Sequence, residues 1–179
     1  MHSLYSLHRL SLKNWLATYA YTQHPDIPEQ DLLDCRLAFC YPRALSALGK
    51  TITRTLDPEV QYIGGSELIS ISASQESADS NHPVSWFTIA NQYISIPAHT
   101  PVAIVAETIR TGNSIIKTLN VCKQHKLDIV QIIVLVDLEY PGGLNNLKLE
   151  IYSKIGLTIF FTKTEIKQQW WEIHKNDGY

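Results

Sequence analysis

The chain has 179 residues, which suffices for one domain with a sizeable core, and its 45% apolar and 18% charged residues are typical of a soluble globular protein. A net charge of −2 gives no electrostatic reason to expect nucleic acid or an anionic membrane as a partner. No apolar run approaches the ~20 residues that a membrane span needs, and no secretory segment stands out near residue 1.

Cysteine and histidine usage bears on the compartment and on metal binding. Cys35, Cys40 and Cys122 are an odd number without CxxC spacing, and the seven histidines are scattered, with no second ligand type at metal spacing. We therefore expect free thiols in a reducing cytoplasm and no metal-ligand cluster.

The first sixty residues indicate two helices with a short strand between them. Leucines and aromatic residues recur at every third or fourth position over 4–19, which predicts an amphipathic helix that ends before the breaker at 24–28. A second helix is predicted over 43–55. Between the helices, Asp34 and Arg36 are expected to form a local ion pair at a strand edge, a contact worth little if exposed.

The next segments predict a strand, a loop and another strand. Residues 61–65 indicate a strand that enters a glycine turn, 74–82 a polar surface loop, and 84–89 a second strand. Residues 90–100 contain no Lys or Arg, and we interpret them as a short turn between two strands.

Residues 101–116 are the stretch around which the rest of the chain is organised. Val102–Val105 is a compact apolar run, typical of a strand buried on both faces of a parallel sheet, and Glu107–Thr108 bounds it. A polar loop at 110–114 follows, and apolar residues at helical spacing begin at Ile115. This order predicts a strand, a tight loop and a helix.

Such a turn can bind an anion. Small residues let backbone N–H groups converge, and the helix N-terminus adds partial positive charge, a combination that suits phosphate. Arg110 can add a bidentate charge-assisted contact. An ordinary strand-to-helix turn, with Asn113 or Ser114 as the helix N-cap, would account for the same residues, so both interpretations stay open.

The second half of the chain continues the alternation of strands and helices. Residues 128–136 form a β-branched, apolar strand suited to the centre of the sheet. The remaining elements are a glycine turn at 142–143, a helix near 145–155, a strand at 157–161 and a last helix capped near 164–165. Trp170 and Trp171 point to different faces of that helix, so one of them is expected at an interface.

Two passages resemble the type I phosphoribosyltransferases, and within them orotate phosphoribosyltransferase. Residues 101–116 are similar to the family's phosphoribosyl pyrophosphate motif, which is an apolar strand, two adjacent acids and a Thr-Thr-Gly-x-Ser-like loop. Residues 34–42 resemble its Tyr-x-Asp-x-Arg strand and the Pro-initiated helix after it. Asp137 with 142–143 resembles its Val-Asp-Arg turn and glycine-rich loop.

The resemblance implies a fold and a set of site residues. The fold is α/β, with a central, mostly parallel sheet flanked by helices and a small N-terminal hood of helices and strands. It implies a single domain over 1–179, made of a hood at 1–58, a core at 59–166 and a C-terminal helix at 167–179. The implied phosphate- and ribose-binding residues, of which Glu107 is the best catalytic candidate, are Glu107, Thr108, Arg110, Thr111, Gly112, Asn113 and Ser114.

The sequence departs from the family where the chemistry is expected. Ala106 stands in place of one of the two acids, and Leu138 in place of the Arg that pairs with the orotate carboxylate. No cationic loop is present at 90–100, and Ser66-Glu67 follows Gly65 where the family has a glycine-rich pyrophosphate turn. In the family's reaction, Mg²⁺-bound phosphoribosyl pyrophosphate loses pyrophosphate, whose developing charge needs cations or metal.

Three hypotheses follow from this pattern. The first is a catalytically impaired binder of phosphoribosyl pyrophosphate or a 5′-mononucleotide, or a partner subunit, without a cofactor. The second is an active, Mg²⁺-dependent orotate phosphoribosyltransferase that makes orotidine 5′-monophosphate in pyrimidine biosynthesis. The third is a structural protein without a ligand. The resemblance also implies a homodimer, with the N-terminal helices as a contact, whereas the nucleobase stays unassigned because the residues that would contact it have changed.

Overall fold

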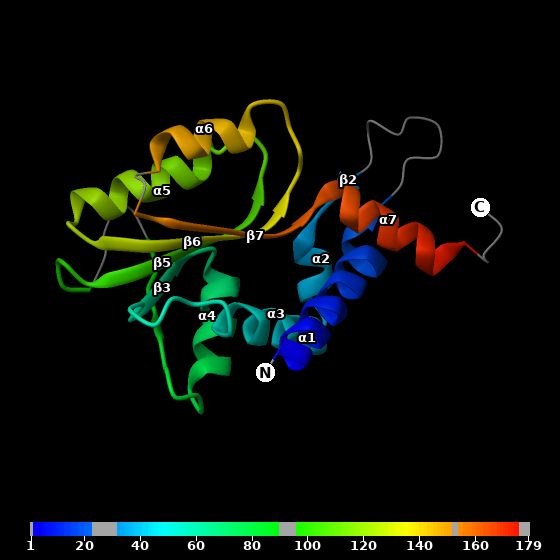
Figure 1. Cartoon of the computed structure of the whole chain (residues 1–179), viewed down its shortest axis with the longest axis horizontal. Coiled ribbons are helices and arrows are strands. Elements are labelled where there is room, and N and C mark those ends of the chain that lie inside the picture. The colour runs from blue at the N-terminus through cyan, green and yellow to red at the C-terminus, as the bar shows by residue number, and fades with distance from the viewer. Residues whose placement is uncertain (1, 23–31, 90–95, 152–153, 176–179) are drawn as a thin grey trace.

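The computed structural model describes residues 2–22, 32–89, 96–151 and 154–175. Its centre is a five-stranded sheet in the order β4-β3-β5-β6-β7, and every described pairing in it is parallel (Figure 1). The strands are β3 (Tyr62–Gly65), β4 (Ser85–Trp86), β5 (Pro101–Ile109), β6 (Asp128–Asp137) and β7 (Gly156–Thr162). The predicted α/β fold with a parallel central sheet is confirmed.

Helices cover both faces of this sheet. In Figure 1, α5 (Asn113–Gln124) and α6 (Gly143–Glu150) lie on one face, and α3 (Pro42–Thr53) and α4 (Glu67–Ser77) lie on the other. The side chains of β5 alternate accordingly: Val102 and Ile104 pack in the core cluster that includes α5, whereas Ala103 and Val105 pack in the cluster that includes α3 and α4. Burial on both faces explains the unbroken apolar runs of the central strands.

β5 is longer than the sequence predicts. It continues past Val105 through the polar pair Glu107–Thr108 to Ile109, and Thr108 pairs with Val136 of β6. The prediction that the polar pair bounds the strand is wrong, because the backbone of these residues still completes the ladder with β6. Their side chains lie at the carboxyl edge of the sheet, where polar groups can be accommodated.

The N-terminal region forms the predicted hood of helices and strands beside the sheet (Figure 1). The helix predicted over 4–19 is confirmed as α1 (His2–Trp15), which ends in a π-helical turn, η1 (Leu16–Ala20). Two short strands, β1 (Tyr21–Thr22) and β2 (Leu32–Leu33), then pair antiparallel. The short helix α2 (Cys35–Phe39) follows them, and the last helix, α7 (Lys163–His174), packs against this region.

The Asp34–Arg36 ion pair is confirmed, although its setting differs from the prediction. Its closest oxygen–nitrogen distance is 2.7 Å, but Arg36 lies in α2 and not in a strand. Asp34 is the N-cap of α2, and its carboxylate accepts a hydrogen bond from the Arg36 backbone N–H, which favours the helix over an extended strand. The Arg36 side chain is 73% exposed, so the pair itself adds little stability.

Several predicted boundaries are corrected. The loop predicted at 74–82 is wrong in its first part, because α4 continues to Ser77 and the hydroxyls of Ser72 and Ser74 donate to carbonyls of neighbouring segments. The strand predicted at 84–89 shortens to two residues at the sheet edge. The turn predicted at 90–100 falls partly outside the described residues, and the division of the chain at 58 and 166 stays a prediction.

The last helix confirms one prediction and corrects another. Its N-cap is Thr162, not Thr164, and Glu165 completes a capping box with Thr162. Trp170 is 9% exposed and Trp171 is 38% exposed, so the two rings do point to different faces. Within the described ranges, no helix is both long and apolar enough to cross a membrane. The three cysteines are free thiols, as expected.

Candidate ligand-binding site

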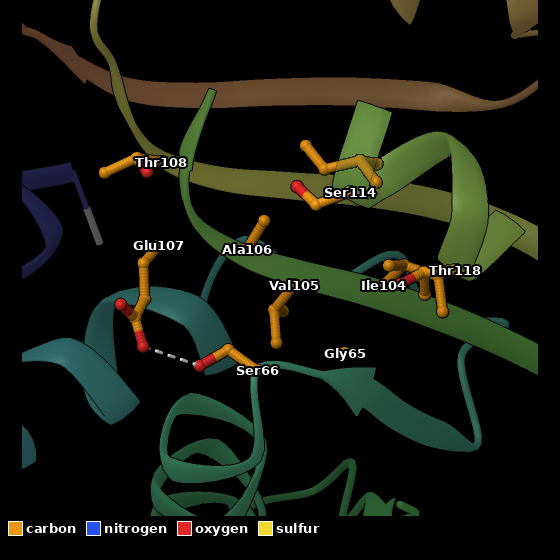
Figure 2. Close-up of a pocket in the computed structure, with 10 residues that line it drawn as sticks. Gly65, Ser66, Ile104, Val105, Ala106, Glu107, Thr108, Ser114 and Thr118 are labelled. Atoms are coloured by element: carbon orange, nitrogen blue, oxygen red, sulfur yellow. Dashed lines mark hydrogen bonds between the residues drawn. The ribbon is translucent and has the colours of Figure 1, made fainter. Parts of the chain in front are cut away.

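A cavity of about 270 Å³ opens at the carboxyl ends of β3 and β5 (Figure 2). These strands are neighbours in the sheet, but the chain leaves them on opposite faces, through α4 after β3 and α5 after β5. Such a topological switch point is where open parallel sheets bind ligands. The lining residues are Gly65, Ser66, Ile104, Val105, Ala106, Glu107, Thr108, Ser114, Ile115 and Thr118.

The wall on the β3 side is held tightly against β5. Gly65 has a φ of +110°, and a Cβ at this position would lie 2.2 Å from the carbonyl oxygen of Val105, so only glycine fits. The backbone N–H of Ser66 donates to the same carbonyl at 2.9 Å. The mouth of the cavity beside α4 is therefore fixed by backbone contacts.

Glu107 supplies the charge on the cavity wall. Its carboxylate accepts a hydrogen bond from the Ser66 hydroxyl at 3.0 Å, and it is the one charged group among the lining residues that the structure describes (Figure 2). Burial, and after it the negative charge of Glu107, raises the pKa of the Cys35 thiol in α2 to about 12. The electrostatic effect of Glu107 therefore extends to the N-terminal hood. Glu107 thus lines the cavity within electrostatic reach of α2.

Ala106 and Glu107 lie on opposite sides of β5. Ala106 packs against the core cluster that includes α5, whereas Glu107 reaches Ser66 at the start of α4. Figure 2 shows the Glu107 carboxylate across the β5 ribbon from Ala106 and Ser114. The neutral Ala106 side chain therefore lies on the α5 side, and the negative charge of the described cavity wall lies on the α4 side.

The loop before α5 has the geometry of an open helix N-terminus. Gly112 is the N-cap, with a φ of +78°, and no side chain among the described residues caps the helix. The prediction that Asn113 or Ser114 serves as N-cap is wrong, because both are already helical. The first-turn N–H groups have no partner within the helix, and Ser114 and Thr118, one turn apart, line the cavity beside them.

Three of the predicted site residues, Glu107, Thr108 and Ser114, line the cavity. The other four lie in the adjoining loop and first turn, outside the lining: Arg110, Thr111, Gly112 and Asn113. The exposed Arg110 guanidinium lies 5.2 Å from the centre of the Tyr140 ring. The roles of all seven in binding phosphate and ribose stay predictions.

The loop also packs against the start of α6. A Cβ at Gly143 would lie 2.0 Å from the carbonyl oxygen of Arg110, and one at Gly112 would lie 3.0 Å from the carbonyl oxygen of Gly143. Asn146 Nδ2 donates to the Thr111 carbonyl at 3.5 Å. The two glycine turns therefore hold one another in place.

Sequence reasoning missed Ser66 and Thr118 as lining residues. Ser66 follows β3, whose carboxyl end meets that of β5 in a parallel sheet, but the predicted glycine turn obscured that position. Thr118 lies four residues after Ser114, which is the spacing that puts two side chains on one face of a helix. Both signals depend on knowing which elements are neighbours.

The donor set offers little to a metal ion held by the protein alone. Among the described residues no group of three His, Cys, Asp or Glu side chains is close enough to bind one. The described lining of the cavity supplies a single carboxylate, Glu107. A Mg²⁺ ion at this place would fit as one that takes most of its ligands from substrate phosphates and water.

No protein-family model matches the chain, and no curated protein matches its sequence. Solved structures do match. Orotate phosphoribosyltransferase of Mycobacterium tuberculosis in complex with inorganic phosphate aligns with a TM-score of 0.75 and 16% identity, over 89% of this chain and 98% of that one. UMP synthase of Leishmania donovani aligns with a TM-score of 0.70 and 15% identity, over 92% of this chain and 38% of that one.

A purine enzyme shares the architecture as well. Adenine phosphoribosyltransferase of Trypanosoma brucei, in complex with AMP, pyrophosphate and ribose-5-phosphate, aligns with a TM-score of 0.67 and 13% identity, over 88% of this chain and 80% of that one. At such identities the likeness is one of fold. Together with the parallel sheet and the cavity at its switch point, it shows that the chain has the type I phosphoribosyltransferase fold.

Proposed function

We propose that the chain binds a phosphosugar or a 5′-mononucleotide, with the phosphate on the loop at 111–114 and the sugar in the cavity, and that its transferase activity is impaired. The observation that carries the binding proposal is the uncapped first turn of α5 beside a cavity lined by hydroxyls and one carboxylate. Solved proteins of this fold bind inorganic phosphate, phosphoribosyl pyrophosphate and AMP.

Each predicted site residue takes a role in this proposal. The backbone amides of Thr111, Gly112, Asn113 and Ser114 surround the phosphate. Arg110 leaves the Tyr140 ring to add a bidentate contact, and Glu107 and Thr108 accept hydrogen bonds from sugar hydroxyls. We also propose one domain, a homodimer and a cytoplasmic location.

The proposal of impaired turnover is supported by what the cavity presents. Among the described residues its wall has one acid and no cation, so no described side chain that lines it offsets the charge of a leaving diphosphate. Leu138, at the position of the family's orotate-binding Arg, packs against the core cluster of α3 and α4. The loss of one charge-stabilising group costs about 10²–10³ in rate, and such losses need not multiply.

The second candidate is an active orotate phosphoribosyltransferase in pyrimidine biosynthesis. It is favoured by the retained carboxylate of Glu107 on the cavity wall, in a fold that spans 98% of a solved orotate phosphoribosyltransferase. In this case Mg²⁺ would arrive bound to phosphoribosyl pyrophosphate, and Glu107 would hold the ribose hydroxyls or the metal.

Calorimetric titration with uridine 5′-monophosphate tests the binding proposal. The variant Ser114→Asp puts a carboxylate where the phosphate is proposed to lie, yet an acid in the first turn suits the helix dipole, so the fold should survive. We expect its affinity to fall by about tenfold or more. The matched control is Asn120→Asp, an exposed position later in the same helix. Equal affinity in both variants, or no binding to the wild-type chain, would remove the phosphate site.

A pyrophosphate-release assay with orotate, phosphoribosyl pyrophosphate and Mg²⁺ separates the two candidates. We expect little or no release from the wild-type chain. Steady release that disappears in Glu107→Ala would establish the active enzyme in place of the impaired one.

A further inference from the structure

We propose that Ser66 is a positioning residue, which fixes the Glu107 carboxylate for a sugar hydroxyl and so lets the site distinguish a sugar phosphate from free phosphate. The inference rests on the proposed function, because it takes the phosphate on the loop at 111–114 and the sugar in the cavity. It deepens that function by naming the group that selects the sugar.

The main chain of Ser66 is held on both sides. Its N–H donates to the Val105 carbonyl at 2.9 Å, beside the contact that leaves no room for a Cβ at Gly65. Its own carbonyl accepts from the backbone N–H of Ser70 at 2.9 Å and from the buried Ser70 hydroxyl at 2.8 Å. The Ser66 side chain therefore starts from a backbone that is fixed to both β5 and α4.

The Ser66 hydroxyl is directed to Glu107 and not to the helix. Ser66 is the N-cap residue of α4, where a serine side chain commonly accepts from a first-turn N–H, yet its side chain makes no such capping bond. The hydroxyl instead donates to one oxygen of the Glu107 carboxylate at 3.0 Å (Figure 2). The side chain therefore serves the cavity, and α4 does not depend on it for a cap.

Without this contact the Glu107 side chain would be loosely held. The ladder between β3 and β5 ends at Val105, so Glu107 lies beyond the last strand neighbour on that side. Its side chain is half-buried, and the Ser66 hydroxyl is the hydrogen-bond partner that the structure describes for it. Ordering a rotamer-rich side chain at the moment of binding weakens a dissociation constant by roughly three- to tenfold. Ser66 removes this cost by ordering Glu107 in the free protein.

The ordered carboxylate has one oxygen left for the ligand. Ser66 donates to Oε1, which leaves Oε2 to accept from a sugar hydroxyl in the cavity that Glu107 lines. Inorganic phosphate on the loop at 111–114 carries no sugar that could reach this oxygen. Ser66 should therefore affect the affinity for a sugar phosphate and not the affinity for free phosphate.

Titrations of Ser66→Ala with ribose 5-phosphate and with inorganic phosphate test the inference. We expect the affinity for ribose 5-phosphate to fall by about three- to tenfold and that for inorganic phosphate, taken from its displacement of uridine 5′-monophosphate, to change by less than about twofold. Ser66→Thr retains the hydroxyl and should restore the affinity for the sugar phosphate. Ser85→Ala, which removes an exposed hydroxyl outside the cavity lining, is the matched control.

A double-mutant cycle with Glu107→Ala shows whether Ser66 acts through the carboxylate. In the Glu107→Ala background, Ser66→Ala should change the affinity for ribose 5-phosphate by less than about twofold, because the group that it positions is gone. An undiminished loss in that background, or an equal loss for the two ligands, would show that Ser66 supports the cavity in general, and the inference would be refuted.

The outcomes also separate this inference from the proposed function. If the wild-type chain binds both ligands and Ser66→Ala changes neither affinity, the positioning role is refuted while phosphate binding stands. If the wild-type chain binds neither ligand nor uridine 5′-monophosphate, both proposals fall.

Discussion

The contact between the two glycine turns allows a sharp test by Gly143→Ala. The new methyl group would lie 2.0 Å from the carbonyl oxygen of Arg110, a backbone atom that cannot rotate away. To reach ordinary contact, the turn at 110–112 or the start of α6 must retreat by more than an ångström. The substitution therefore acts directly on the loop that is proposed to bind phosphate.

Two opposing effects set the expected magnitude. Overpacking of a tight site costs about 1–3 kcal/mol. Replacing glycine by alanine returns up to about 1 kcal/mol, because alanine is the better helix former and reduces the entropy of the unfolded chain. We expect a net loss of about 1–2 kcal/mol in the free energy of unfolding. Affinity for uridine 5′-monophosphate should fall on the order of tenfold, because a displacement of this size misplaces the binding groups.

Urea unfolding and calorimetric titration measure the two effects. The matched control is Gly156→Ala at the start of β7, where the added Cβ would meet its nearest neighbours at 3.7 Å, an ordinary contact. If Gly143→Ala is as stable as Gly156→Ala and binds the nucleotide as the wild type does, the two turns do not support one another as described.

Four further predictions concern the rest of the chain. Lys126 follows α5 with a φ of +55°, so Lys126→Gly should raise the free energy of unfolding by about 0.5–1 kcal/mol in urea titration, and a lower value would show that no strain is stored there. Burial raises the pKa of the Cys35 and Cys122 thiols from 9.0 to about 12, so the unfolded state releases these protons first. The free energy of unfolding should then fall above pH 9 by up to about 1.4 kcal/mol per pH unit for each thiol, and a flat profile from pH 9 to 11 would contradict this. At pH 8 a thiol reagent should modify the exposed Cys40 alone in the native chain, and Cys40→Ser should abolish the reaction. Asp34→Ala should destabilise the chain by about 1 kcal/mol through loss of the α2 cap, whereas Asp34→Asn should cost less; equal losses would show that the cap is not the cause.

The sequence by itself determined the α/β class and the central elements. The run at 102–105 is apolar at every position, and the run at 128–136 is apolar apart from Asp128 and Gln131. Such runs are typical of strands covered on both faces, and β5 and β6 confirm this prediction. The small polar residues at 110–114 likewise predicted a tight turn before α5. These features depend on the order of apolar and polar residues along a short segment, which can be read directly from the sequence.

Tertiary structure alone decided which other residues join Glu107, Thr108 and Ser114 at the cavity. The contacts between Ser66 and Glu107, and between Gly143 and Arg110, join residues that are far apart in the chain. No local sequence pattern predicts these contacts, because they form only when the carboxyl ends of the parallel strands lie side by side. The helix cap at Gly112 was missed for a related reason: its left-handed backbone depends on the close approach of the neighbouring turn, which leaves no room for a side chain.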